Sequence, residues 1–232
     1  MANLLCLDFD DTMVMENTFR QVMERFVPQD TWEQYVAQRP TEMTVEQSNA
    51  AEIDLIDPSV SEHEIASFVR DTAVVREGLL ELTDWAHWND WLTSVVSLGL
   101  DLYVDPVIDD LKLDRMARHM GRTHNTYRWQ VRYYSPRGIE IQDGFKLSYA
   151  KAFQDAGDFV VYVGDGQSDV APARMAQAVF ARGTLLDRLQ GEHPRLYPFE
   201  TFHDVVAVLE READGWVASF SSTTEYTKRT KE

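Results

Sequence analysis

The chain has little cysteine and no long apolar run, and each shortage excludes a class of protein. Cys6 is the one cysteine among 232 residues, which excludes a disulfide framework and is typical of a reducing compartment. No apolar stretch approaches the roughly 18 residues of a membrane span. No basic region followed by an apolar one opens the chain, as it would in a signal peptide. We therefore expect a cytoplasmic protein without a membrane partner.

Basic residues are also scarce. The chain has 22 Lys and Arg against 39 Asp and Glu, a net charge of −17. Because nucleic acids and anionic membranes repel such a charge, both are excluded as main partners. Residues 30–90 are the most acidic, and either solubility or repulsion of polyanionic substrates explains their charge. The composition does not decide between a monomer and a homodimer.

Apolar runs alternate with helical patterns along the chain. This order is typical of an α/β protein with a doubly wound, Rossmann-like parallel sheet. A β-hairpin is expected at residues 127–142, where period-two segments flank Ser-Pro-Arg-Gly. Strands are predicted at 4–7, 91–98, 159–163 and 178–181, and helices at 17–26, 45–56, 61–69, 77–88, 111–120, 145–156 and from 169 onward.

The first strand ends at two carboxylates, Asp8 and Asp10. Side chains alternate along a strand, so these two point the same way. Two like charges held together need a cation, a shared proton or abundant water. An acidic loop would explain such a pair equally well, so its interpretation depends on what else the fold brings to it.

Polar residues also end the other predicted strands. Ser97 lies at the end of the second and Asp165 just after the third, and the carboxyl ends of parallel strands meet at the sheet edge where ligands bind. Four short motifs occur in order: D-F-D-D-T at 8–12, V-V-S-L-G at 95–99, G-F-K-L-S at 144–148 and V-G-D-G-Q-S-D at 163–169. Each motif alone is weak evidence, but the ordered set is specific.

This set resembles the haloacid-dehalogenase-like phosphatase superfamily over about residues 3–190. The phosphoserine-phosphatase-like branch is indicated by V-R-E-G-L-L-E-L at 75–82 and by Glu16-Asn17. Within it, the segments at 95–104 and 163–186 resemble the methionine-salvage phosphatases, which act on a methylthio-ketopentenyl phosphate. The resemblance predicts the reaction more securely than the substrate, because the residues that select the substrate lie outside these motifs.

The resemblance implies roles for four catalytic residues. Asp8 is the expected nucleophile, which forms an aspartyl-phosphate. Asp10 is the expected proton donor and then acceptor, and a carboxylate at this position favours complete hydrolysis. Lys146 is expected to neutralise the phosphate and Asp8, and Ser97 to donate a hydrogen bond to the phosphoryl group.

The resemblance also implies a cofactor, Mg²⁺, and a phosphate-binding loop. Asp8, Asp165 and the main-chain carbonyl of Asp10 are the expected metal ligands, with Asp169 in support. Asp8, Ser97 and Lys146 are expected to contact the phosphate. Three further residues are expected to contact it as well: Thr12, Leu98 and Gly99. Leu98 replaces a glycine found in many relatives, which leaves the serine's role intact and reshapes the adjoining pocket.

The motif spacing predicts the domain organisation. Asp8 and Ser97 are separated by far more chain than one crossover needs, so we expect a helical cap at 14–74 on a core formed by 1–13 and 75–218. The polar segment 219–232 is expected to be frayed. Since the cap has few cations, it suits a neutral or cationic leaving group better than a dicarboxylate.

We therefore expect a Mg²⁺-dependent phosphomonoesterase that hydrolyses a small phosphorylated metabolite. A phosphotransferase or phosphomutase of the same fold remains an alternative, because it shares the nucleophile and the metal. A non-catalytic phospho-acceptor signalling domain is a second alternative. Such a domain also uses an acidic pair, a Ser or Thr and a Lys, but it places its acceptor Asp on a later strand.

Overall fold

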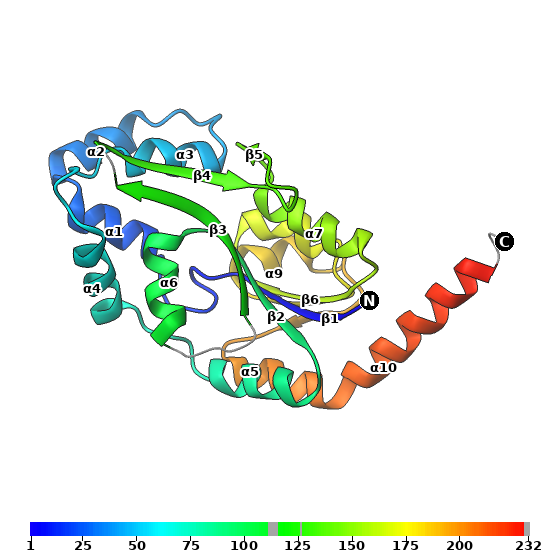
Figure 1. The fold of residues 1–232 in the computed structure, drawn as a ribbon. Coiled ribbons are helices and arrows are strands. Elements are labelled where there is room, and N and C mark those ends of the chain that lie inside the picture. The colour runs from blue at the N-terminus through cyan, green and yellow to red at the C-terminus, as the bar shows by residue number, and fades with distance from the viewer. Residues whose placement is uncertain (111–115, 126, 230–232) are drawn as a thin grey trace.

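A single sheet organises the molecule. The computed structural model describes residues 1–110, 116–125 and 127–229. They form an eight-stranded sheet. The sheet lies between helices (Figure 1). The strand order is β5-β4-β3-β2-β1-β6-β7-β8, parallel from β3 to β8. The strands are β1 (Asn3–Leu7), β2 (Leu92–Leu100), β3 (Met116–Asn125), β4 (Trp129–Tyr134), β5 (Glu140–Ile141), β6 (Phe159–Gly164), β7 (Ala178–Ala181) and β8 (Leu196–Pro198).

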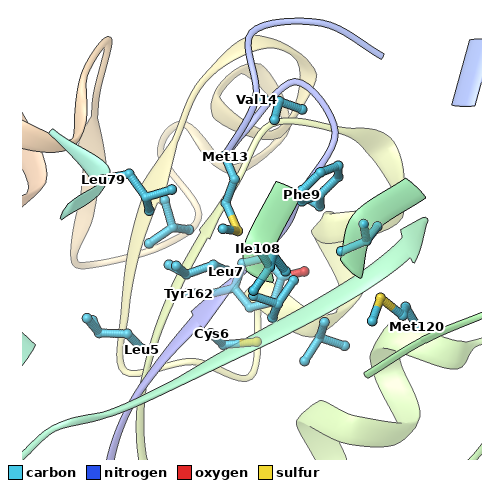
Figure 2. Packing of buried hydrophobic residues seen from close by; sticks show 14 of the residues in the cluster. Leu5, Cys6, Leu7, Phe9, Met13, Val14, Leu79, Ile108, Met120 and Tyr162 are labelled. Atoms are coloured by element: carbon cyan, nitrogen blue, oxygen red, sulfur yellow. The ribbon is translucent and has the colours of Figure 1, made fainter. Parts of the chain in front are cut away.

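Strands β1 and β6, which lie in the middle of the parallel part of the sheet, are buried on both faces. Cys6 and Tyr162 face the same side, toward α7 (Phe145–Asp155) and α8 (Val170–Ala173). Phe159 faces the other side, where its ring lies 5.8 Å from that of Trp91 and 5.3 Å from that of Phe220. Figure 2 shows β1 residues packed among buried side chains from other elements. The α/β prediction is therefore confirmed.

The helices around the sheet follow the alternation of the sequence. α5 (Leu79–Trp88) packs against α10 (Phe202–Arg229), and α6 (Asp101–Asp110) follows β2 directly. A short 3₁₀ turn, Gln167–Asp169, and α9 (Gly183–Leu189) complete the core. The sequence patterns did not identify α6, α9, α10 or β8. No helix within the described ranges is long and apolar enough to cross a membrane.

Four helices form an inserted segment between β1 and α5. They are α1 (Thr18–Phe26), α2 (Gln29–Gln38), α3 (Val45–Ile53) and α4 (Glu62–Thr72), of which α2 was not predicted. α3 and α4 begin with complete capping boxes at Thr44 and Ser61. Val14 pairs with Val75 in an antiparallel bridge, so the chain enters and leaves this segment side by side.

One predicted helix is a strand. Residues 116–120 of the helix expected at 111–120 belong to β3, and residues 111–115 lie outside the described ranges. Hydrogen bonding to β2 outweighs the helical spacing of the apolar residues, and Met120 is buried in the core. The predicted hairpin is confirmed, because β4 pairs antiparallel with β5.

The polar tail expected from residue 219 is instead helical as far as Arg229, because α10 continues through it. Phe220 anchors this part of the helix by packing on Phe159 of β6. The far end of α10 extends beyond the sheet (Figure 1).

Candidate active site

The predicted site residues converge on one cavity at the carboxyl ends of β1, β2 and β6. The cavity has a volume of about 200 Å³. Its lining includes seven of the nine residues predicted for the site: Asp8, Asp10, Ser97, Leu98, Gly99, Lys146 and Asp165. The other two, Thr12 and Asp169, are fully buried directly behind it. Residues 157 positions apart in the chain thus meet because parallel strands end at one edge.

Lys146 connects the central carboxylates. It lies in the first turn of α7, only 4% exposed, and its Nζ is 2.6 Å from Asp8 Oδ1 and 2.7 Å from Asp169 Oδ1. Burial acts to lower the pKa of Lys146, and the combined charges and hydrogen bonds of Asp169 and Asp8 raise it above its usual range. The ammonium is therefore a permanent positive charge beside Asp8.

Asp169 uses both carboxylate oxygens within the protein. Oδ1 accepts hydrogen bonds from Lys146 and from the Tyr162 hydroxyl (2.6 Å), while Oδ2 accepts the main-chain N–H of Gly166 (2.9 Å). A Cβ at Gly164 would lie 2.8 Å from this carboxyl group, so only glycine fits there. Asp169 therefore orients Lys146 and the 164–166 turn.

Asp10 is held by partners different from those of Asp8. Its Oδ1 accepts the main-chain N–H of Thr18 (2.7 Å), and its Oδ2 accepts the hydroxyl of Tyr103 (3.1 Å). Burial raises the pKa of Asp10 to about 6, against the lowering effect of these hydrogen bonds. A carboxyl group with this pKa is suited to exchanging a proton near neutral pH.

The carboxylates at this edge outnumber the cations. One oxygen each from Asp8, Asp165 and Asp169 lies within 4.8 Å of the others. Burial and the charge of Asp169 raise the pKa of Asp165 to about 6, and the same two causes raise the pKa of Asp8 against the ammonium of Lys146. Three carboxylates face one ammonium, and this oxygen-rich, electron-rich cluster fits a divalent cation such as Mg²⁺.

Ser97, near the end of β2, presents a hydroxyl to the cavity. Ser97 Oγ accepts the main-chain N–H of Gly99 (2.9 Å), which leaves the hydroxyl hydrogen available for donation. Thr12 is placed differently from the prediction, since its hydroxyl donates to Asp165 Oδ1 (3.4 Å). Its side chain therefore supports a carboxylate and does not line the cavity.

Several residues that shape the site were not identified from the sequence. Tyr103 comes from the unpredicted helix α6. Arg76, 2% exposed, donates to the main-chain carbonyls of Asp11 and Thr12 and so fixes the turn after β1. Glu46 of α3 accepts the N–H of Phe145 (2.9 Å) at the start of α7. Arg76 lies in the V-R-E-G-L-L-E-L motif, which gave it no role in the site, and no local pattern distinguishes Tyr103 and Glu46 from core aromatics or surface charges.

A second, larger cavity of about 690 Å³ adjoins the first. The two share five lining residues: Asp11, Asn17, Phe19, Val45 and Asn49. Trp32 and Met43 add apolar surface to the larger one. Trp32 is stacked on Tyr35, with ring centroids 6.1 Å apart.

A doubly wound sheet whose strands β1, β2 and β6 lead to a carboxylate-rich site, with a helical segment inserted after β1, is the arrangement of a Rossmann-like enzyme that uses aspartates. The family profile of the haloacid dehalogenase-like hydrolases matches residues 5–174. The chain belongs to this family.

Curated relatives from two Bacillus species are similar to this chain over most of its length. The 2-hydroxy-3-keto-5-methylthiopentenyl-1-phosphate phosphatases of Bacillus anthracis and of Bacillus cereus strain AH820 are each 28% identical over 208 residues. The alignments cover 88% of this chain and 94% of each relative.

Solved structures show the same fold. A phosphoserine phosphatase with a phospho-aspartyl intermediate analogue is similar with a TM-score of 0.65 at 17% identity, covering 89% of this chain and 98% of that one. A haloacid-dehalogenase-family hydrolase from Salmonella enterica serovar Typhi has a TM-score of 0.66 at 14% identity, covering 90% and 72% of the two chains.

Proposed function

We propose that the chain is a Mg²⁺-dependent phosphomonoesterase that works through an aspartyl-phosphate on Asp8. The observation that carries this proposal is that the carboxylates of Asp8 and Asp10, at the end of β1, have different partners. The carboxylate of Asp8 lies 2.6 Å from a buried ammonium, whereas the carboxylate of Asp10 accepts hydrogen bonds from the Tyr103 hydroxyl and the Thr18 N–H. One group is thereby suited to attack and the other to proton transfer.

Asp8, Asp165 and the main-chain carbonyl of Asp10 would hold Mg²⁺. Asp169 would support the site without being a ligand, because its two oxygens already accept four hydrogen bonds, from Lys146, Tyr162, Asp165 and Gly166. When bound, the metal supplies positive charge that offsets the carboxylates and the incoming phosphate.

The protein groups account for both half-reactions. In the first, a carboxylate oxygen of Asp8 forms a bond to phosphorus, the phosphorus–alkoxide bond breaks, and Asp10 protonates the leaving oxygen. In the second, Asp10 removes a proton from water, the water oxygen attacks phosphorus, and the bond to Asp8 breaks. Lys146 and Ser97 stabilise the phosphoryl oxygens throughout. We further propose that the helical segment 14–74 acts as a cap that excludes bulk water from these steps.

Phosphate release from p-nitrophenyl phosphate tests the proposal. The Mg²⁺-loaded enzyme is expected to release one phosphate per nitrophenol, and chelation by EDTA is expected to reduce the rate at least about a hundredfold. Re-addition of Mg²⁺ should restore it. Unchanged activity in EDTA would contradict the metal-dependent mechanism, and nitrophenol formed without free phosphate would favour a phosphotransferase.

The larger cavity favours a leaving group without a carboxylate. Its two cations are ion-paired: Arg39 lies 3.1 Å from Glu52, and Arg20 lies 2.7 Å from Glu24. Ser48 also donates to Glu52 (2.6 Å), which keeps that carboxylate in place. We therefore propose a substrate whose leaving group is uncharged and has an apolar end, of which the methylthio-ketopentenyl phosphate in the relatives' name is the leading candidate.

Phosphoserine provides the corresponding substrate test. We expect its kcat/KM to be at least about tenfold below that of the methylthio-ketopentenyl phosphate, because its carboxylate finds no unpaired cation in the cavity. Glu52→Gln releases Arg39 from its ion pair, so in this variant the difference in kcat/KM between the two substrates should be smaller. A wild-type preference for phosphoserine would defeat the charge argument and leave the phosphatase chemistry intact.

A further inference from the structure

Asn49 occupies the boundary between the two cavities. It lies on α3 of the helical segment, is 7% exposed, and lines both the cavity of Asp8 and the larger cavity beside it. A substrate with its phosphate at Asp8 and its apolar end in the larger cavity would pass this side chain. Asn49 therefore adjoins the carbon atoms next to the phosphoester.

The amide nitrogen of Asn49 is fully used within the protein. Nδ2 donates to the main-chain carbonyl of Leu98 (2.9 Å) and to the hydroxyl oxygen of Tyr133 (2.7 Å). Tyr133 donates its own hydrogen to the same Leu98 carbonyl (2.7 Å). A carbonyl can only accept, and the hydroxyl hydrogen is already used, so only the NH₂ end of the amide fits against this pair.

This arrangement determines what Asn49 presents to a ligand. With the NH₂ group turned to Leu98 and Tyr133, the remaining polar atom is the carbonyl oxygen Oδ1. Within the described residues Oδ1 has no hydrogen-bond partner, and it is not among the atoms that are buried without one. An acceptor held in one orientation and open to the cavity selects a donor on the substrate.

We propose that Asn49 is a specificity-determining residue whose Oδ1 accepts a hydrogen bond from a hydroxyl on the carbon next to the phosphoester carbon. This inference rests on the proposed phosphatase function and defines its substrate class as 2-hydroxy phosphate monoesters. The relatives' substrate name places a phosphate on carbon 1 and a hydroxyl on carbon 2, as this geometry requires. Because Nδ2 binds the carbonyl of Leu98, next to Ser97 in β2, the same side chain also joins the helical segment to the end of that strand.

A pair of esters that differ in one hydroxyl tests the proposal. Glycerol 1-phosphate carries the neighbouring hydroxyl, and 1,3-propanediol monophosphate lacks only that group. Wild type is expected to prefer glycerol 1-phosphate about tenfold in kcat/KM, as one hydrogen bond to a preorganised acceptor provides. Asn49→Ala, or the closer-sized Asn49→Leu, should reduce this ratio to about one.

Tyr133→Phe is the matched control. It removes the second partner of Nδ2 but retains the bond to Leu98, so both esters should be hydrolysed more slowly while the preference persists. An equal loss for both esters in the Asn49 variants, with an unchanged ratio, would show a purely structural role and overturn the proposal. So would the absence of any preference in wild type. If wild type hydrolysed none of the three compounds, neither the two esters nor p-nitrophenyl phosphate, the phosphatase function itself would be rejected.

Discussion

Asp8→Asn is expected to abolish phosphate release, with a loss of at least about 10⁴-fold in kcat. The amide is a far weaker nucleophile than the carboxylate and forms no acyl phosphate. The fold should survive, because Lys146 keeps its 2.7 Å contact with Asp169. In the absence of metal the variant should be as stable as wild type or more so, since it removes one of three crowded carboxylates. Steady-state kinetics with p-nitrophenyl phosphate and urea unfolding in EDTA measure the two effects.

A matched control separates chemistry from charge. Asp84→Asn makes the same change at an exposed position on α5, outside both cavities, and should retain wild-type kinetics. Phosphate release by Asp8→Asn within tenfold of wild type would contradict the assignment of the nucleophile. A large loss of stability in EDTA would contradict the account of charge crowding.

Lys146→Met is expected to impair both activity and stability. Without the ammonium, the buried carboxylates of Asp8 and Asp169 face each other with no counter-charge. Breaking a buried ion pair in this way costs about 3–5 kcal/mol of unfolding free energy. We expect kcat to fall by roughly 10²–10³ or more, because the transferring phosphoryl group also loses a charge partner. Urea unfolding in EDTA and in Mg²⁺ should show a smaller stability loss with the metal.

Lys151 provides the comparison for this variant. It is exposed on the same helix, so Lys151→Met removes an equal charge from α7 without entering the site. This control should unfold and turn over like wild type. If Lys146→Met were as stable as wild type in EDTA, the ion pairs would not be what holds the carboxylates together.

The strand-end motifs were predictable because each is a local pattern. A buried parallel strand requires a continuous apolar run, and the first polar residue after it marks the sheet edge. Asp8 follows β1 and Asp165 follows β6 in this way, whereas Ser97 lies within β2, three residues before its last residue, Leu100. All three line one cavity, as their positions implied. Lys146 was found only through its motif, since a lysine that begins a helix is ordinarily exposed to solvent.

The supporting residues were not predictable, because their partners are remote in the chain. Tyr103 binds a carboxylate 93 positions away, and Asn49 binds a carbonyl 49 positions away. Residues 116–120 are another example. The spacing of their apolar residues predicts a helix, but they form a strand because they pair with β2. Polarity and period report local preference, whereas burial and hydrogen bonding depend on which elements pack together.

The sequence by itself determined the class of chemistry: paired carboxylates, a serine, a lysine and a third aspartate at the ends of apolar strands. Only the tertiary structure decided how those groups differ. Asp8 and Asp10 are chemically identical side chains, and the distinct roles that we propose for them rest on Lys146 on one side and Tyr103 on the other. The substrate selection that we propose likewise depends on the tertiary structure, because α3 brings Asn49 to the end of β2 and Arg39 of the larger cavity is paired with Glu52. Charge and proton affinity depend on neighbours in space, and the fold supplies those neighbours.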